Sequence, residues 1–441
     1  MKLSDLPLIL KTYFLLRKSI HWPKEKLDKF QKKKIEELMK FLKAKSPYYS
    51  QLIEDTNYES FKELPVIDKA EFMNNFNSIV TCDLDRDELI EFTIEAERES
   101  SLKVYKGEYS TGLSSGTSGN KTLTVLGRKE RVGYGVAIFL RKGVYNLLRK
   151  RVLFALRTNN PAYMKAGVLG TTLFFVDYTH SIEELCELIN QNNLNVIAAP
   201  PSLLQLLARN IQRIDHKIDW LVSYAEVLDR DVKDFLEETF DSPLSQIYQG
   251  AEGFIAFTCK EGNLHLNEDL IHFEFEQVAD SSPSVVNVIV TDLHRRTLPV
   301  VRYKMNDVIE LSDKSCECGS NFRTIAKIHG RKDDIFLLEG NDGTKYLFPD
   351  YVRRSINQAS SQVTEFQAIQ HPDSSVEIRL ILSGESSPED IEKKIRENLQ
   401  NYIGKLGAET PKIYFRYISP EVNKRSGKMI RVRRIKGENG D

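Results

Sequence analysis

Apolar and polar positions recur with two different periods along this chain. Residues 24–45 carry apolar side chains three and four positions apart and lysines between them, which predicts an amphipathic helix. From about residue 120 to 330, β-rich runs alternate with helical runs. The β-rich runs are 152–156, 172–176, 196–199 and 285–291, and the helical runs are 182–191, 203–212 and 231–240. This alternation predicts an α/β fold in which helices cover the sheets.

The pattern changes near residue 330. Residues 363–383 predict two strands, residues 388–402 an amphipathic helix, and residues 412–418 a further strand. This order is typical of a small α+β domain. We therefore expect a large N-terminal α/β domain with helix-covered sheets over residues 1–330, and a small C-terminal α+β domain over residues 331–441, joined by a hinge.

Composition narrows the class of protein. The 441 residues include 62 Lys+Arg and 63 Asp+Glu, a net charge of -1, which argues against nucleic-acid binding through bulk charge. Five cysteines are too few for a disulfide scaffold. No apolar run is long enough for a membrane span. We expect a cytoplasmic protein with no nucleic-acid partner.

The apolar stretch at residues 6–16 has two interpretations. It is not typical of a secretory signal, because Asp5 precedes it, Lys11 interrupts it and Arg17 follows it. It is either a short helix packed on the body of the protein or an interfacial membrane anchor. The lysine face of residues 24–45 is similarly either a solvated face or a surface for an anionic partner.

A Ser/Gly-rich segment is the first candidate for chemistry. Its hydroxyls could donate to an anion, and its glycines let backbone N–H groups approach. It is not a Walker A loop, because Asn120 takes the place of the lysine after the last glycine. On composition alone, a phosphate-binding loop and an ordinary surface loop fit equally well. The segment consists of Ser114, Ser115, Gly116, Thr117, Ser118 and Gly119.

Five motifs in order resemble those of the adenylate-forming superfamily of acyl-CoA synthetases and adenylation domains. The first is the Ser/Gly-rich segment. The others are Tyr248-Gln-Gly-Ala-Glu252, Arg302-Tyr-Lys-Met-Asn-Asp307, Gly330-Arg-Lys-Asp-Asp334 and Ser426-Gly-Lys428. The chain is most similar to the branch of phenylacetate–CoA ligase and coenzyme F390 synthetase-like proteins, because Ser46-Pro-Tyr-Tyr49 follows the N-terminal helix and Tyr224-Ala-Glu226 has the spacing of that branch. The resemblance covers nearly the whole chain.

The resemblance implies an ATP-dependent activation of a carboxylic acid as acyl-AMP. It assigns the β- and γ-phosphates to the Ser/Gly-rich segment, the adenine to Tyr248, both ribose hydroxyls to Asp307 and the ribose region near the hinge to Arg331. Glu252 would bind Mg²⁺. Lys428 would contact the carboxylate and the α-phosphate in the transition state.

The resemblance also implies the substrates. The acid pocket would be bordered by Ala199, Pro200, Ala225 and Glu226, and the default acid is aromatic. The acyl group would pass to CoA or a carrier thiol after the small domain rotates about a hinge near residues 330–334. A homodimer is compatible with the resemblance.

Two other functions stay open. One is transfer of AMP to an acceptor hydroxyl, as in F390 synthetase-like proteins. The other is a nucleotide-binding protein without turnover, suggested by Lys304-Met-Asn306, where the superfamily has a different sequence. Residues 337–349 are also longer than the usual link after the junction motif. These departures bear on the acceptor and on the second half-reaction more than on ATP binding.

Four residues form a candidate zinc site. Cys259, His265, Cys316 and Cys318 make up a Cys₃His set, which suits structural Zn²⁺. The alternative is a group of unrelated reduced cysteines. A zinc ion there would join the turn after Glu252 to the turn after Asp307 without entering the chemistry. Cys82 and Cys186 are expected to be ordinary thiols.

Overall fold

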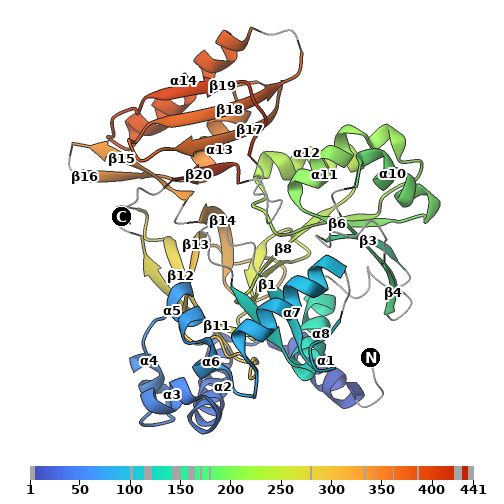
Figure 1. The fold of residues 1–441 in the computed structure, drawn as a ribbon, viewed down its shortest axis with the longest axis vertical. Helices are drawn as coiled ribbons and strands as arrows, with labels where there is room; N and C mark the ends of the chain where they lie inside the picture. The colour runs from blue at the N-terminus through green and yellow to red at the C-terminus, as the bar shows by residue number, and fades with distance from the viewer. Residues whose placement is uncertain are drawn as a thin grey trace.

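The computed structural model describes residues 5–99, 103–113, 122–141, 150–156, 164–168, 171–177, 180–278, 281–331, 334–341, 343–360, 362–384, 387–421 and 430–435. Within these residues a large unit contains a 12-stranded sheet and a C-terminal unit contains a four-stranded sheet. The C-terminal unit lies at the top of Figure 1 and the N-terminal helices lie at the bottom. The predicted α/β class is confirmed. The domain boundary between residues 330 and 331 stays a prediction.

The large sheet joins a parallel half to an antiparallel half at β8. Its strands, in spatial order, are β11 (Ile271–Gln277), β12 (Val285–Asp292), β13 (Tyr303–Leu311), β14 (Thr324–Arg331), β10 (Leu264–Leu266), β9 (Gly253–Thr258), β8 (Leu244–Gly250), β7 (Trp220–Ser223), β6 (Val196–Ala199), β3 (Arg151–Leu156), β5 (Thr171–Asp177) and β4 (Met164–Val168). Strands β8, β7, β6, β3 and β5 pair in parallel. A separate pair consists of β1 (Ser110–Leu113) and β2 (Leu123–Leu126).

Helices cover the sheet where its strands are apolar on both faces. The helices of the large unit are α1 (Leu6–Ser19), α2 (Lys24–Lys45), α3 (Pro47–Leu52), α4 (Tyr58–Glu63), α5 (Lys69–Asn74), α6 (Phe76–Ile79), α7 (Arg86–Glu99), α8 (Arg128–Arg141), α10 (Ile182–Gln191), α11 (Pro201–Arg209) and α12 (Arg230–Phe240), with a short 3₁₀ turn η2 (Ile211–Arg213). Ile197 and Leu221 belong to the buried cluster of α10–α12, whereas Val196 and Val222 belong to the main core. Alternate strand residues therefore serve opposite faces.

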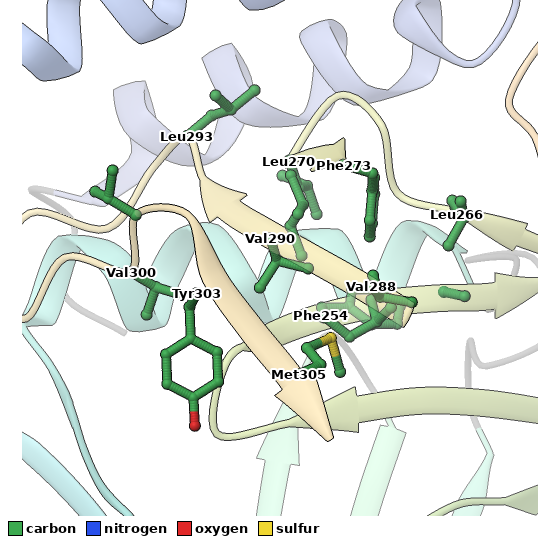
Figure 2. Close-up of a cluster of buried hydrophobic side chains, with 14 of the residues drawn as sticks. Phe254, Leu266, Leu270, Phe273, Val288, Val290, Leu293, Val300, Tyr303 and Met305 are labelled. Atoms are coloured by element: carbon green, nitrogen blue, oxygen red, sulfur yellow. The ribbon is translucent and has the colours of Figure 1, made fainter. Parts of the chain in front are cut away.

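The main core lies in the antiparallel half of the sheet. Figure 2 shows side chains of β9, β11, β12 and β13 converging there, among them Phe254, Phe273, Val290 and Met305. Tyr303 is 3% exposed and packs edge-on against Phe72 of α5, with ring centroids 5.4 Å apart. The N-terminal helices are thus part of this core rather than an appendage.

The C-terminal unit has a core of its own. Its elements are β15 (Phe336–Gly340), β16 (Gly343–Leu347), α13 (Pro349–Asn357), β17 (Val363–Gln370), β18 (Val376–Leu382), α14 (Pro388–Lys405), β19 (Ile413–Arg416) and β20 (Val432–Arg434). The sheet order is β19-β18-β17-β20, and one buried cluster draws on β15–β18, α13, α14, β19 and β20. The long segment 337–349 is accounted for by the β15–β16 hairpin and the entry into α13.

Helix α1 packs on the body of the large unit. Leu16 and Ser19 are fully buried, and Arg141 Nη1 donates to the Leu16 carbonyl at 3.1 Å. None of the helices in the described ranges combines the length and the apolar character that crossing a bilayer requires. The cytoplasmic location stays a prediction.

Candidate active site

The carboxyl ends of the parallel strands gather the residues predicted for the acid pocket. Ala199 ends β6 and pairs in register with Ser223 at the end of β7. Pro200 is the buried residue before α11, and Ala225 and Glu226 lie one residue beyond the end of β7. In open α/β sheets, ligands bind outside the carboxyl ends of parallel strands. The structure therefore brings these four predicted residues to one edge.

Hydrogen bonds fix the loop that carries Glu226. Its carboxylate accepts from the Ser202 backbone N–H at 3.1 Å and from Ser202 Oγ at 2.9 Å, at the first turn of α11. Ala225 has φ 67°, a left-handed conformation that a residue with a Cβ rarely adopts. Strained backbone of this kind concentrates at ligand sites. Tyr224 Oη donates to the carbonyls of Ala155 and Ala198.

Three residues of the predicted nucleotide site meet at the end of β8. Tyr248 Oη donates to Asp307 Oδ2 at 2.5 Å. Asp307 of β13 pairs in register with Arg331 of β14. Burial raises the pKa of the Tyr248 phenol well above its usual value, and the adjacent Asp307 carboxylate raises it further. Tyr248 therefore stays a neutral hydrogen-bond donor that orients Asp307.

Glu252 lies in the turn between β8 and β9, beside the same carboxylate. Burial raises the pKa of Glu252, and Asp307 adds to the rise, whereas Arg295 and Arg331 oppose it. The side chain folds back over Gly250, where a Cβ would overlap the Glu252 carboxylate. Two carboxylates close together in a half-buried site repel each other, and a divalent cation between them would relieve this repulsion.

A network that the motifs did not indicate supports this turn. Arg295 Nη1 donates to the Ala251 carbonyl at 2.7 Å, and its guanidinium forms an ion pair with Asp292 at 3.3 Å. Tyr134 of α8 donates to the same Asp292 carboxylate. Asp292 also accepts from the backbone N–H groups of His294 and Arg295. The only signal in the sequence is the polar run from His294 to Thr297, one residue after the apolar strand β12.

Arg302 has a structural role even though it opens one of the motifs. Its Nε and Nη2 donate to the two carboxylate oxygens of Glu274 at 3.0 and 2.8 Å, and Nη1 donates to the Lys62 carbonyl at 2.5 Å. The backbone of Arg302 is left-handed, with φ 44°. Arg302 thus attaches the C-terminal end of α4 to β11 of the sheet. Of the unusual residues that follow, Lys304 pairs with Glu276 and Met305 is part of the core.

Two of the predicted elements fall outside the described residues. They are the Ser/Gly-rich segment from Ser114 to Gly119 and the lysine Lys428. Their roles stay predictions. The strand that precedes the segment, β1, and the strand that follows it, β2, are described and pair in antiparallel register.

The four candidate zinc ligands lie together. Their ligand atoms are all within 4.8 Å of one another. Cys259 Sγ and Cys316 Sγ are 3.6 Å apart, and Cys318 Sγ is 3.4 Å from His265 Nε2. Four ligands around one tetrahedral Zn²⁺ would be separated by about 3.4–3.8 Å. A disulfide is excluded at this distance, because its sulfurs would lie about 2.05 Å apart.

The surroundings of the four ligands fit a metal as well. His265 is fully buried, and its Nδ1 lies 2.9 Å from the Phe322 carbonyl, so that Nδ1–H donates there and Nε2 presents a lone pair to the three sulfurs. Asn263 Nδ2 donates to Cys316 Sγ at 3.2 Å. The cluster connects the β9–β10 turn to the β13–β14 loop, and His21 Nδ1 contacts the Gly319 carbonyl at 3.0 Å.

An ion pair connects the two units next to the acid pocket. Arg353 of α13 donates from Nε to Asp229 Oδ2 at 3.0 Å and from Nη2 to Oδ1 at 3.4 Å. The two side chains are only 10% and 16% exposed. Asp229 stands at the N-cap of α12 but makes no cap hydrogen bond, so its carboxylate is committed to Arg353. Burial lowers the pKa of Arg431, whereas the negative charges of Glu226 and Asp229 raise it.

No protein-family model matches the chain. Its sequence is 24% identical to Protein CapK of Staphylococcus aureus over 408 residues, which cover 86% of this chain and 83% of the relative. It is 23% identical to a phenylacetate-coenzyme A ligase of Thermus thermophilus over 373 residues, covering 79% of each.

Solved structures agree with these sequence relatives. 2-Hydroxyisobutyryl-CoA ligase in its postadenylation state, in complex with 2-HIB-AMP, superimposes with a TM-score of 0.72 at 16% identity, over 96% of this chain and 92% of that one. The fold of the chain is therefore that of the adenylate-forming enzymes, and the predicted resemblance to AMP-forming ligases is confirmed. Its sequence relatives thus include both Protein CapK and a phenylacetate-coenzyme A ligase.

Proposed function

We propose that the protein activates a carboxylic acid with ATP and passes the acyl group to CoA or a carrier thiol. The observation that carries this proposal is the convergence of Tyr248, Glu252 and Asp307, with Arg331 paired beside Asp307, at the end of β8. These residues come from three strands and one turn, and each has the side chain that nucleotide activation requires. The acid pocket borders the same edge of the sheet.

The first half-reaction forms the acyl-AMP. A carboxylate oxygen of the acid attacks the α-phosphorus, the bond from that phosphorus to the bridging oxygen breaks, and pyrophosphate leaves. Asp307, oriented by Tyr248, accepts from the ribose hydroxyls, and Arg331 lies beside it. Glu252 would hold Mg²⁺, which would supply positive charge to the phosphates. Hydroxyls of residues 114–118 hold the β- and γ-phosphates, and Lys428 donates to the charge that develops.

In the second half-reaction a thiolate attacks the acyl carbon and AMP leaves. We propose that the C-terminal unit turns about residues 330–334 between the two steps. The chain superimposes on the postadenylation state of 2-hydroxyisobutyryl-CoA ligase with a TM-score of 0.72, but on its thioesterification state with 0.55 over a similar share of the chain. The present arrangement of the units supports an assignment to the first step.

Replacing Asp307 by asparagine is expected to weaken ATP binding by about 10- to 100-fold, because a hydrogen bond to a charged group is worth roughly 1.5–3 kcal/mol. Isothermal titration with Mg-ATP measures this. Tyr248→Phe is the matched variant, because it removes only the hydroxyl that orients Asp307, and it should weaken binding less. If Asp307→Asn bound ATP with unchanged affinity, the Asp307 carboxylate would not be the group that binds the ribose.

Breaking the ion pair between the units is expected to affect the two half-reactions differently. Arg353→Ala should slow acid-dependent ATP–pyrophosphate exchange by about tenfold, because Asp229 loses its charged partner in the arrangement assigned to that step. Thiol transfer from preformed acyl-AMP should be unchanged or faster. The exchanged pair Asp229→Arg/Arg353→Asp should recover part of the exchange rate. Equal slowing of both steps would argue against a role in domain rotation.

We also propose that Cys259, His265, Cys316 and Cys318 hold a structural Zn²⁺. The proposal is supported by the separations of the ligand atoms and by the orientation of His265. The ion would fix the β9–β10 turn against the loop between β13 and β14, the strands that carry Asp307 and Arg331. It would take no part in the reaction, since Glu252 and Asp307 are not among its ligands.

The chemical class of the acid is a separate part of the proposal. Phe154 stacks on Tyr224 with ring centroids 5.2 Å apart and an interplanar angle of 20°, and both rings lie beside the carboxyl ends of β3 and β7. An aromatic wall of this kind favours an aromatic acid. Transfer of AMP to a hydroxyl is the second candidate, favoured only by the resemblance to F390 synthetase-like proteins. A panel of acids separates the two, because only the first requires an added carboxylate.

A further inference from the structure

Helix α1 presents an apolar stripe to solvent. Leu6, Leu10 and Phe14 are 49%, 47% and 54% exposed, although each is a large apolar side chain. They are spaced four residues apart and therefore lie on one face of the helix. Figure 1 shows α1 at the edge of the large unit, on the side opposite the C-terminal unit.

Cations accompany this stripe and acids do not. Lys11, Arg17 and Lys18 are exposed in the same helix, whose sequence contains no aspartate or glutamate. At about 100° per residue, Lys11 and Lys18 fall within about 60° of Phe14 along one edge of the stripe, and Arg17 falls between Leu6 and Leu10 in angle. Asp5, which precedes the helix, is buried in an ion pair with Arg128 at 2.8 Å.

The opposite face attaches α1 firmly to the protein. Leu16 and Ser19 are fully buried, and Arg141 of α8 donates to the Leu16 carbonyl at 3.1 Å. Ser19 Oγ and the Arg141 guanidinium both donate to the buried Asp269. The helix is therefore held in one orientation, with its apolar and cationic groups turned outward.

We propose that α1 docks the protein on the surface of an anionic lipid bilayer. A helix that lies in the interface plane buries an apolar stripe among the acyl chains and places lysine and arginine at the headgroups. Anionic lipids attract such cations, each of which contributes while it lies within a Debye length of the surface. The described part of α1 supplies both contributions on one face.

A second copy of the chain fits this face less well. In a two-fold symmetric contact the same patch of each copy faces the other, so the patch that contains Lys11, Arg17 and Lys18 would face a patch with the same three cations. Three half-exposed side chains also fall far short of the roughly 1,200–2,000 Å² that a stable interface buries. A bilayer needs no complementary shape and supplies the missing negative charge.

Vesicle co-sedimentation of the full chain tests the proposal. Vesicles of phosphatidylcholine alone and of phosphatidylcholine with phosphatidylglycerol are compared at low and high salt. We expect binding to the anionic vesicles, weaker binding at high salt, and little binding to the neutral ones. Leu10→Gln/Phe14→Gln should weaken binding by about tenfold or more, since it removes the apolar contribution. Lys11→Gln/Lys18→Gln should weaken binding and flatten its salt dependence.

The matched control also replaces one leucine and one phenylalanine by glutamine, but at exposed residues outside α1. Leu206 of α11 and Phe235 of α12 are 40% and 41% exposed, and Leu206→Gln/Phe235→Gln should bind vesicles as the wild type does. No binding of the wild type to anionic vesicles would overturn the proposal. Equal loss in the control would also overturn it. A concentration-dependent dimer that only Leu10→Gln/Phe14→Gln disrupts, without vesicle binding, would assign the stripe to a second copy instead.

Discussion

Lys428→Ala is expected to lower the rate of acyl-AMP formation by orders of magnitude while leaving the affinity for ATP nearly unchanged. Negative charge builds on the α-phosphate only as the carboxylate attacks, so a cation that acts there stabilises the transition state more than the bound nucleotide. Removing one preorganised donor of this kind costs about 10²–10³ in rate. Acid-dependent ATP–pyrophosphate exchange measures the rate, and titration with Mg-ATP measures the affinity.

The control for this variant comes from the same basic segment. Lys424→Ala removes one positive charge four residues earlier and should retain most of the activity. If both variants lost activity equally, the effect would be one of general charge rather than of Lys428. Full activity of Lys428→Ala would remove the lysine from the proposed mechanism.

Cys316→Ser/Cys318→Ser is expected to eliminate about one equivalent of bound zinc and to lower the melting temperature by roughly 5–10 °C. When the ligands come from segments distant in sequence, the free energy of metal binding adds to the free energy of folding. A loss of a few kcal/mol lowers the thermal unfolding midpoint by several degrees in a domain of this size. The four ligands span residues 259 to 318, so the ion would close a long loop. Elemental analysis and thermal unfolding measure the two effects.

The remaining cysteines provide the comparison. Cys82→Ser/Cys186→Ser alters thiols that lie outside the cluster and should retain the full equivalent of zinc. The site would be contradicted if wild-type protein, prepared without chelators, contained no zinc and unfolded at the same temperature as the double variant.

Periodicity predicted the elements of the fold whose apolar pattern is consistent along the chain. The predicted helix over residues 24–45 coincides with α2, and the predicted strand over residues 196–199 coincides with β6. Both have a consistent pattern over their whole length, which is why local sequence was sufficient. For residues 337–349 the sequence predicts only a long link. The two-stranded hairpin found there depends on contacts outside itself, since Glu409 N–H donates to the Glu339 carbonyl at 2.7 Å.

The site was harder to predict where its parts are distant in sequence. Tyr134 and Asp292 are 158 residues apart, and no motif connects them, yet they support the turn before Glu252. Arg302 illustrates the opposite case, since a motif identifies the residue but not the direction of its side chain. The direction of a side chain depends on the backbone conformation. The left-handed φ of Arg302 cannot be predicted from its sequence, because glycine is the residue that usually signals such a conformation.

The central claim is that this site adenylates a carboxylic acid. The most direct test is pyrophosphate release with Mg-ATP over a panel of aromatic and aliphatic acids, without CoA. The account predicts release that depends on the acid, that is strongest for one chemical class and that is lost in Lys428→Ala. Absence of release with every acid, in protein that binds ATP, would contradict it and favour AMP transfer to another acceptor or a nucleotide-binding protein without turnover.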